Sequence, residues 1–568
     1  MALSKRGAQF AAVGMTVALA AAACGGGSDN SNTGTSGGKK PEGKKGGTLN
    51  ILMAGDFEHL DPARVYVVDS SDFSRLYART LMTYKPVPGK EGTTVIPDLA
   101  KGKGESSDEA KTWKYTLKDG LKFQDGSPIT SKDIKYGAER SFSADLPEGA
   151  PYARQYLDCK DFKGPYVDKS GTGCSAIETP DDKTIVFHLN RSVGDFDYTV
   201  ALPVFSPVPK SKDTGTKYDG MPFSSGPYKF ETYSRGKSIV MVRNDQWDAK
   251  TDDVRPAFPD IIKVTQGLDP AVIDQRLIGD SGADQTAIDF DTTVAPENLS
   301  KVLVNPQVKS RSNAGFDNCN RYIALNTKKA PMDNVKVRQA INYAINKETY
   351  RTARGGPSAG DYASTIIVPS LNGHKDFDLY KADPQGDVEK AKQLLTEAGF
   401  PNGFAVTLKT TNKGKGVTTA VAVQAALARV GIKVNVDQVD SSVYYTEIGD
   451  TAKEPAMVFY GWCPDWPSAS TVLPVLFDGR NIQPQGNNNV SQYNNDAVNT
   501  KFDEISKMTD ANKIGQAYGE VDELIMKDAP IVPLLNSKSL ILHGSKVKGG
   551  YFMEALGGVY DVVTLSVA

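Results

Sequence analysis

The stretch GVTTAVAVQAALARVGIKVNVDQVD, residues 416–440, decides the fold class of this chain. Its first half is rich in residues that favour a helix, Gly431 interrupts the pattern, and IKVNVDQVD alternates apolar and polar residues as a strand does. A helix that leads directly into a strand is the repeating unit of α/β proteins. We therefore predict a helix, a glycine stop and a strand in this stretch.

The neighbouring segments continue the alternation. FAVTLKTT at 404–411 is predicted to be a strand, and the helix predicted before it, at 386–400, is ended by Gly399. Further upstream, RYIALNT is a predicted strand and residues 334–353 a predicted amphipathic helix, while residues 531–544 return to strand. These units predict a mostly parallel or mixed sheet with helices on its faces.

The first half of the chain has a different pattern of predicted helices and strands. Helical spacing of apolar residues predicts a helix over 69–84, and the alternating WKYTL with the Asp-Gly pair at 119–120 predicts a hairpin over 111–130. The next helix is expected to begin at Thr130 or Ser131, either of which is a suitable N-cap. Two further strands are predicted, at 183–190 and 239–245.

Length and charge limit the classes of function. A chain of 568 residues is too long for one core, so two or three globular units are expected. The formal net charge is −2, and no long basic block occurs beyond the short region 39–45. Because nucleic-acid binding depends on clustered Lys and Arg, we expect no nucleic-acid partner.

The N-terminus predicts export and a lipid anchor. After two basic residues, the apolar stretch 8–23 is too short for a typical spanning helix, so residues 1–23 are expected to be a signal peptide. The tail AAAC resembles a bacterial lipobox, which implies a lipid on Cys24, although Ala21 stands where that motif usually has Leu. An ordinary Ala-x-Ala cleavage that leaves a free cysteine is the alternative. Residues 24–45 are expected to form a flexible tether.

The remaining cysteines predict two disulfides. Without Cys24 their number is even, as expected in an oxidising compartment, and three pairings are possible. We favour Cys159–Cys174, which closes a short polar loop, and Cys319–Cys463, which joins distant segments. A structural zinc site is the alternative, but none of the four histidines is spaced near a cysteine in a ligand pattern, so we expect no metal.

One acid lies among aromatic residues. In AMVFYGWCPDW, which ends at 466, an apolar strand runs into a glycine, and Asp465 then lies between Trp462 and Trp466. A carboxylate in such a setting is costly without a partner. It can be a general acid, a metal ligand or a socket for a cation, and the alternative is a turn or helix-cap acid.

Several segments together resemble one family. They are HLDP at 59–62, PDLAKG at 97–102, WKYTLKDGLKFQDGSPITSKDIKY at 113–136, SSGPYKFETY at 224–233, VRNDQWD at 242–248 and ALNTKKAPMDNVKVRQAINYAINKE at 324–348. In this order they resemble the dipeptide- and oligopeptide-binding lipoproteins of bacterial ABC importers, the solute-binding protein family 5. The match covers nearly all of residues 46–545.

The resemblance implies a fold. It is the α/β, two-lobed fold of periplasmic binding proteins (type II, cluster C) with an extra subdomain inserted in the first lobe. Carried over, lobe one is residues 46–315 plus 533–568, with the insertion at about 86–205, and lobe two is residues 316–532.

The resemblance also implies a binding site. Gly461, Trp462 and Cys463 match the family strand whose backbone pairs with an extended peptide, and Asp465 matches the acid that takes the peptide's ammonium group. Trp466 completes the aromatic surroundings of that acid. In the family the cysteine is bonded to one in the position of Cys319, which supports that pairing. The position that carries an Arg in some oligopeptide binders is Phe459 here, so the socket for a peptide carboxylate is unassigned.

Three residues from the other lobe complete the predicted site. Asp56 and Phe57 match the family's other peptide-pairing strand, and Tyr136 matches a tyrosine whose hydroxyl approaches the ligand's amino end. The alternatives are loop packing for Phe57 and helix core for Tyr136.

The expected function is non-enzymatic: capture of a peptide by a monomer without cofactor, and its delivery to ABC permease subunits at the outer face of the bacterial cell membrane. A binder of sugars, nickel complexes or another small solute is the alternative on the same fold. A secreted hydrolase is a third hypothesis, because GGPSAG at 355–360 fits Gly-x-Ser-x-Gly around Ser358. That motif needs a strand-to-helix elbow, and a loop is predicted here.

Overall fold

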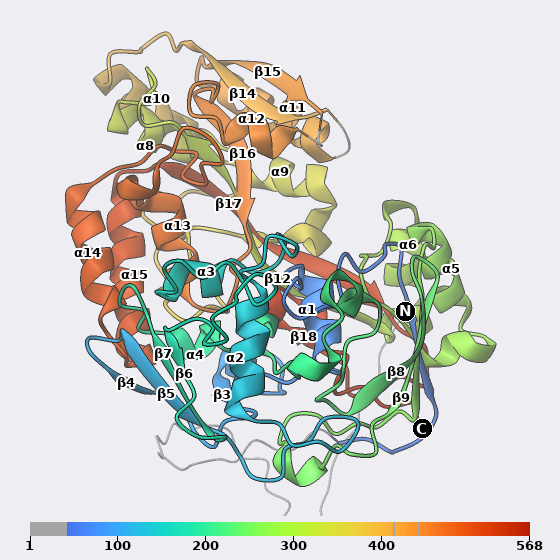
Figure 1. The fold of residues 1–568 in the computed structure, drawn as a ribbon. Helices are drawn as coiled ribbons and strands as arrows, with labels where there is room; N and C mark the ends of the chain where they lie inside the picture. The colour runs from blue at the N-terminus through green and yellow to red at the C-terminus, as the bar shows by residue number, and fades with distance from the viewer. Residues whose placement is uncertain (1–41, 413–414, 441–442, 568) are drawn as a thin grey trace, which may run out of the picture. The chain divides into compact units, whose positions relative to one another are not determined.

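Five sheets organise residues 42–412, 415–440 and 443–567, which are the residues that the computed structural model describes (Figure 1). The two largest sheets have five and six strands. The predicted signal peptide, Cys24 and most of the predicted tether lie outside the described residues. Within the described ranges, no helix has both the length and the apolar character needed to cross a membrane.

The five-stranded sheet is mixed. Its strands, in sheet order, are β11 (Ala287–Asp289), β1 (Thr48–Leu52), β10 (Ile261–Thr265), β9 (Ser238–Arg243) and β8 (Tyr228–Ser234). β1 is parallel to both of its neighbours, whereas β9 is antiparallel to β10 and β8. Helix α5 (Pro270–Gly279) packs Ile273 and Leu277 against Ala287 of β11. The predicted strand at 239–245 is therefore β9.

The six-stranded sheet confirms the predicted α/β alternation. Its strands, in sheet order, are β13 (Gly360–Tyr362), β17 (Ile531–Leu542), β12 (Ser312–Leu325), β16 (Met457–Trp462), β14 (Ala405–Thr411) and β15 (Lys433–Val439). Helices α10 (Val388–Glu397) and α11 (Lys415–Ala428) alternate with β14 and β15 and lie beside them in Figure 1. β14 is parallel to β15 and β16, while β12 is antiparallel to β16 and β17, so the sheet is mixed.

A four-stranded sheet corrects the predicted hairpin at 111–130. Its order is β4 (Glu105–Ser107), β5 (Thr112–Thr116), β7 (Thr184–His188) and β6 (Ile177–Glu178). The hairpin prediction is wrong because β5 pairs with the distant β7 and with β4, while the second half of the segment only turns tightly, with Phe123 N–H donating to Ser127. Helix α2 (Ser131–Arg140) then begins after Thr130, as predicted; the Thr130 backbone N–H donates to Asp133 at 2.8 Å.

Two predicted helices are shorter than their apolar patterns. α1 covers only Val68–Ser74, because the carbonyl oxygens of Leu76 and Tyr77 accept from the backbone N–H groups of Tyr228 and Ser225 instead of continuing a helix. The 334–353 pattern forms α8 (Val335–Ala344) and α9 (Lys347–Arg354), since Asn346 begins a new helix by accepting from Thr349 N–H at 2.9 Å.

The two long strands β12 and β17 pair along most of their length, with an irregularity in the middle. Residues 312–316 of β12 pair with 538–542 of β17, and the register then shifts before Asn320. Within this bulge Asn318 has φ of 56°, in the left-handed region. Both expected disulfides, Cys159–Cys174 and Cys319–Cys463, are present, and the second begins at the bulge.

Candidate ligand-binding site

Asp465 follows β16 and is held by two tyrosines. Its Oδ1 accepts from the Tyr66 hydroxyl at 2.6 Å, and its Oδ2 accepts from the hydroxyl of Tyr152. Burial raises the pKa of Asp465, and the two hydroxyls act in the opposite direction by stabilising the charged form. In the part of the chain that the structure describes, no Lys, Arg or His forms an ion pair with it. This carboxylate is therefore suited to receive a cation from outside the protein.

The two tyrosines come from segments that the sequence analysis did not single out. Tyr66 precedes α1 and is 43% exposed, and Tyr152 begins α3 (Tyr152–Tyr156). They lie 399 and 313 positions from Asp465 in the chain. No local spacing pattern points to a contact between residues so far apart.

The two tryptophans beside Asp465 have different surroundings. Trp466 is 1% exposed, packs edge-on against Tyr152 with ring centroids 4.7 Å apart, and donates from Nε1 to Asp195 at 3.1 Å. Trp462 is half-buried and donates from Nε1 to the carbonyl oxygen of Thr471 at 2.7 Å. Trp466 thus supports the wall behind Asp465, while Trp462 is only partly buried. Roles in ligand binding for both remain predictions.

One edge of β16 ends without a strand partner. β12 pairs with β16 from Met457 to Trp462, but on the other side β14 pairs only with Met457 and Val458. The Phe459 carbonyl oxygen accepts from the Tyr444 hydroxyl at 2.5 Å. Among the described strands, none covers this edge from Phe459 to Trp462. Such an edge offers backbone groups to an extended guest.

Gly461 allows a close approach between strands. A Cβ at this position would lie 2.5 Å from the Asn320 carbonyl oxygen and 2.8 Å from Nη1 of Arg321, its partner on β12. Two positions later, the Cys319–Cys463 disulfide ties the end of β16 to β12. The strand end that leads to Asp465 is therefore fixed to the sheet.

A basic group adjoins this strand end. Burial lowers the pKa of Lys415, and the positive charges of Arg354 and Arg321 lower it further, so the three cations lie close enough to repel one another. The Nε atoms of Arg321 and Arg354 are buried, and neither has a hydrogen-bond partner among residues 42–412, 415–440 and 443–567. The half-buried Asp317 lies near both guanidinium groups; burial raises its pKa, and their positive charges act to lower it. Three cations and one carboxylate leave this group with a net positive charge, so it can receive an anion.

The three predicted residues of the other lobe have contacts of their own. Phe57 is 1% exposed and stacks on Phe73, with centroids 4.5 Å apart. Asp56 accepts from Gln266 Nε2 at 2.7 Å, and the Tyr136 hydroxyl donates to Asp213 at 2.9 Å. The structure does not bring these three into hydrogen-bond contact with Asp465, and their roles in binding remain predictions.

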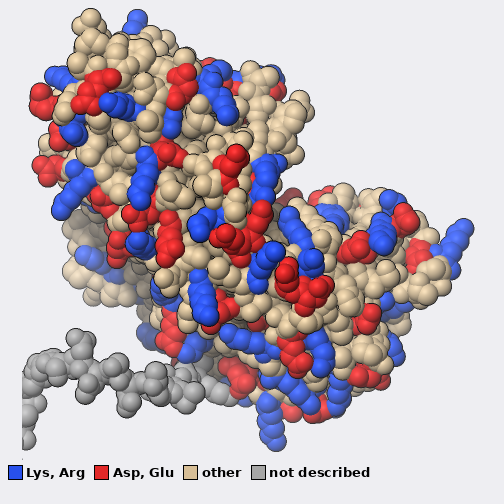
Figure 2. All heavy atoms as spheres, turned by 90° about the vertical axis from the view of Figure 1, so that its left-hand side faces the viewer, with Lys and Arg blue, Asp and Glu red and all other residues tan. Residues whose placement is uncertain are grey.

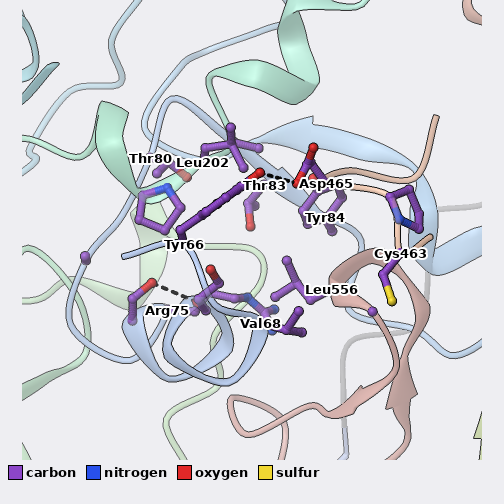
Figure 3. Close-up of a pocket in the computed structure, with 17 residues that line it drawn as sticks. Tyr66, Val68, Arg75, Thr80, Thr83, Tyr84, Leu202, Cys463, Asp465 and Leu556 are labelled. Carbon is purple, nitrogen blue, oxygen red and sulfur yellow. Dashed lines mark hydrogen bonds between the residues drawn. The ribbon is translucent and has the colours of Figure 1, made fainter. Parts of the chain in front are cut away.

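A cavity of about 100 Å³ lies beside Asp465 (Figure 3). Figure 3 shows Asp465 and Cys463 on one side of it, with Arg75 and Val68 on α1 and its flanks.

The hydrolase motif lies elsewhere: Ser358 is in a 3₁₀ turn after α9, where its hydroxyl donates to the Gly355 carbonyl oxygen at 3.0 Å. That turn is not a strand-to-helix elbow.

Residues 94–484 match the family model described as bacterial extracellular solute-binding proteins, family 5 Middle. The chain belongs to this family. Heme-binding protein A of Haemophilus influenzae is 27% identical over 500 residues, covering 83% of this chain and 84% of that protein. Glutathione-binding protein GsiB of Escherichia coli K12 is 24% identical over 527 residues, covering 90% of this chain and 93% of that protein.

The comparison of structures supports the same assignment. Clavulanic acid biosynthesis oligopeptide binding protein 2 superposes with a TM-score of 0.86 at 35% identity, covering 93% of this chain and 97% of that one. The predicted fold class, a two-lobed α/β periplasmic-binding-protein fold, is confirmed. Members of this family are non-enzymatic, extracytoplasmic solute-binding components of ABC transporters.

Proposed function

We propose that this protein captures oligopeptides between its two lobes and delivers them to the permease of an ABC importer. The observation that carries the proposal is Asp465, whose carboxylate has two tyrosine hydroxyls as partners and, within the described residues, no cation. The ammonium group of a peptide would supply the missing positive charge through a charge-assisted hydrogen bond. The backbone of Gly461 to Cys463 then lies where the following peptide groups would pair.

The basic group of Arg321, Arg354 and Lys415 would bind the carboxylate terminus of the peptide. Arg321 lies opposite Gly461 on β12, so a carboxylate there would meet the Nε atoms of Arg321 and Arg354, which have no hydrogen-bond partner in the described part of the chain. Asp465 lies four positions after Gly461, a span of at most about 13 Å for an extended chain. A peptide of three or four residues covers that distance with both termini bound.

A second candidate function is the binding of a non-peptide solute on the same fold. A relative named for heme favours keeping it, whereas glutathione, for which another relative is named, is itself a tripeptide with a free amino group. A non-peptide guest without an amino group would leave the Asp465 charge unpaired, which is costly. The peptide proposal therefore accounts for the site better.

The location of the protein is proposed from its N-terminus. A lipid on Cys24, at the start of the 24–45 tether, would hold the protein at the outer face of the cell membrane as a monomer. Lobe one would comprise residues 46–315 and 533–568, with the 86–205 insertion, and lobe two residues 316–532. A Cys24→Ala variant should appear in the growth medium; continued membrane association would contradict the anchor.

Asp465→Asn tests the proposed function. For a tetrapeptide with a free amino terminus we expect affinity to fall by at least about thirtyfold, or about 2 kcal/mol, since the carboxylate charge is removed from a buried pair. The N-acetylated tetrapeptide should bind the wild-type protein weakly and lose little more in the variant. Isothermal titration calorimetry measures both.

The matched control is Asp245→Asn, which makes the same charge change at a carboxylate that is 82% exposed. It should leave both affinities unchanged. Equal losses for free and acetylated peptides in Asp465→Asn would remove Asp465 from the site. Failure of the wild-type protein to bind any free peptide would favour the non-peptide alternative.

A further inference from the structure

The cavity beside Asp465 has walls of mixed character. Its volume is about 100 Å³, well above the roughly 10–15 Å³ that one water molecule needs. Leu202, Leu556 and Val68 supply apolar surface, while Arg75 and Tyr84 supply polar groups. Figure 3 shows Tyr84 next to Asp465 and the Arg75 guanidinium directed toward Leu556 and Val68. A side chain with apolar methylene groups and a polar end fits such walls.

Three hydrogen-bond donors around this cavity have no acceptor. They are Nε and Nη2 of Arg75 and the hydroxyl of Tyr84, and each is without a partner in the described part of the chain. Arg75 is 7% exposed and Tyr84 3% exposed. Buried donors are nearly always satisfied in folded proteins, so these groups mark a place where an acceptor is expected to bind.

The charges around Arg75 indicate which acceptor fits. Its Nη1 donates to Asp72 at 2.8 Å and to Asp561 at 2.9 Å, and both carboxylates are fully buried. With two carboxylates around one guanidinium, a further anion would gain no net attraction. A cationic side chain carries only hydrogen-bond donors, and the Arg75 and Tyr84 groups that need a partner are donors too. A neutral acceptor suits the remaining nitrogens best.

We propose that this cavity receives the side chain of the ligand's first residue and favours a carboxamide, whose oxygen accepts from Arg75 and Tyr84. The inference rests on the proposed function, because the cavity adjoins the carboxylate that would take the amino terminus. Asp465 and Cys463 both line the cavity, so the first side chain of a bound peptide starts at its mouth. The methylene groups of a glutamine would then contact Leu202 and Leu556.

The tetrapeptides Gln-Ala-Ala-Ala and Met-Ala-Ala-Ala test this inference. Glutamine and methionine have similar length and flexibility, but only glutamine carries the neutral acceptor. We expect the wild-type protein to bind the glutamine peptide about tenfold more tightly, as measured by calorimetry. Tyr84→Phe should reduce that preference about fivefold and leave the methionine peptide unaffected.

Tyr198→Phe is the matched control, because the Tyr198 ring packs against Tyr84 but does not line the cavity. This variant should keep the wild-type preference. Tyr84→Phe should also unfold at an unchanged or higher temperature without peptide, since the Tyr84 hydroxyl has no acceptor to lose within the described residues.

The possible outcomes separate the two proposals. Equal affinity of the two peptides for the wild-type protein overturns the carboxamide subsite and leaves peptide capture standing. An undiminished preference in Tyr84→Phe likewise overturns it, because the hydroxyl then contributes nothing. Binding of neither peptide contradicts peptide capture itself, and the subsite with it.

Discussion

A carboxylate held by two phenol hydroxyls makes ligand binding depend on pH. Only ionised Asp465 attracts an ammonium group, and burial raises its pKa above the ordinary value for an aspartate. Affinity for a free-amino peptide should therefore fall as the pH drops through this raised pKa. Tyr152→Phe removes a donor that favours the charged form, so the loss of affinity should begin at a higher pH. Dissociation constants measured between about pH 4 and 8 check this.

Tyr166→Phe is the control for this prediction, because the Tyr166 hydroxyl donates instead to Asp213, at 2.8 Å. It should leave the pH dependence as it is in the wild-type protein. A pH dependence that Tyr152→Phe does not move would mean that another group controls binding.

The sequence predicted Asp465 as a candidate because an acid among tryptophans needs a partner. Its partners Tyr66 and Tyr152 were not predicted, since their contacts depend on the folded chain.

At the scale of elements, the sequence predicted the helices and strands that depend on residues close together in the chain. Helix α11, the Gly431 stop and β15 follow from the spacing of apolar residues between 416 and 440. The hairpin at 111–130 failed because β5 has a better partner in β7, which lies about 70 positions away and which no turn signal reveals. The unpaired edge of β16 was likewise implied only by the family resemblance, because it depends on where β14 ends.

At the scale of the whole molecule, β12 and β17 take part in both proposed lobes. Residues 312–316 of β12, at the proposed boundary of lobe one, pair with 538–542 of β17, whereas residues 320–324 pair with 531–536 of β17 and also with β16. The bulge between Phe316 and Asn320 interrupts the regular ladder between these two parts. Figure 2 shows acidic and basic side chains interspersed on one face of the molecule.

This arrangement predicts that the lobes rotate about the bulge when a peptide binds. In the structure Asp465, from the proposed lobe two, already accepts hydrogen bonds from Tyr66 and Tyr152 of lobe one, so this is the closed arrangement, which a guest that bridges these groups would stabilise over an open one. Small-angle scattering should give a smaller radius of gyration with a free-amino tetrapeptide than without it. Asp465→Asn at the same peptide concentration should show no such decrease, because the guest that links the lobes is weakly bound. An unchanged radius in the saturated wild-type protein would contradict closure, and binding would then occur between lobes already in their final positions.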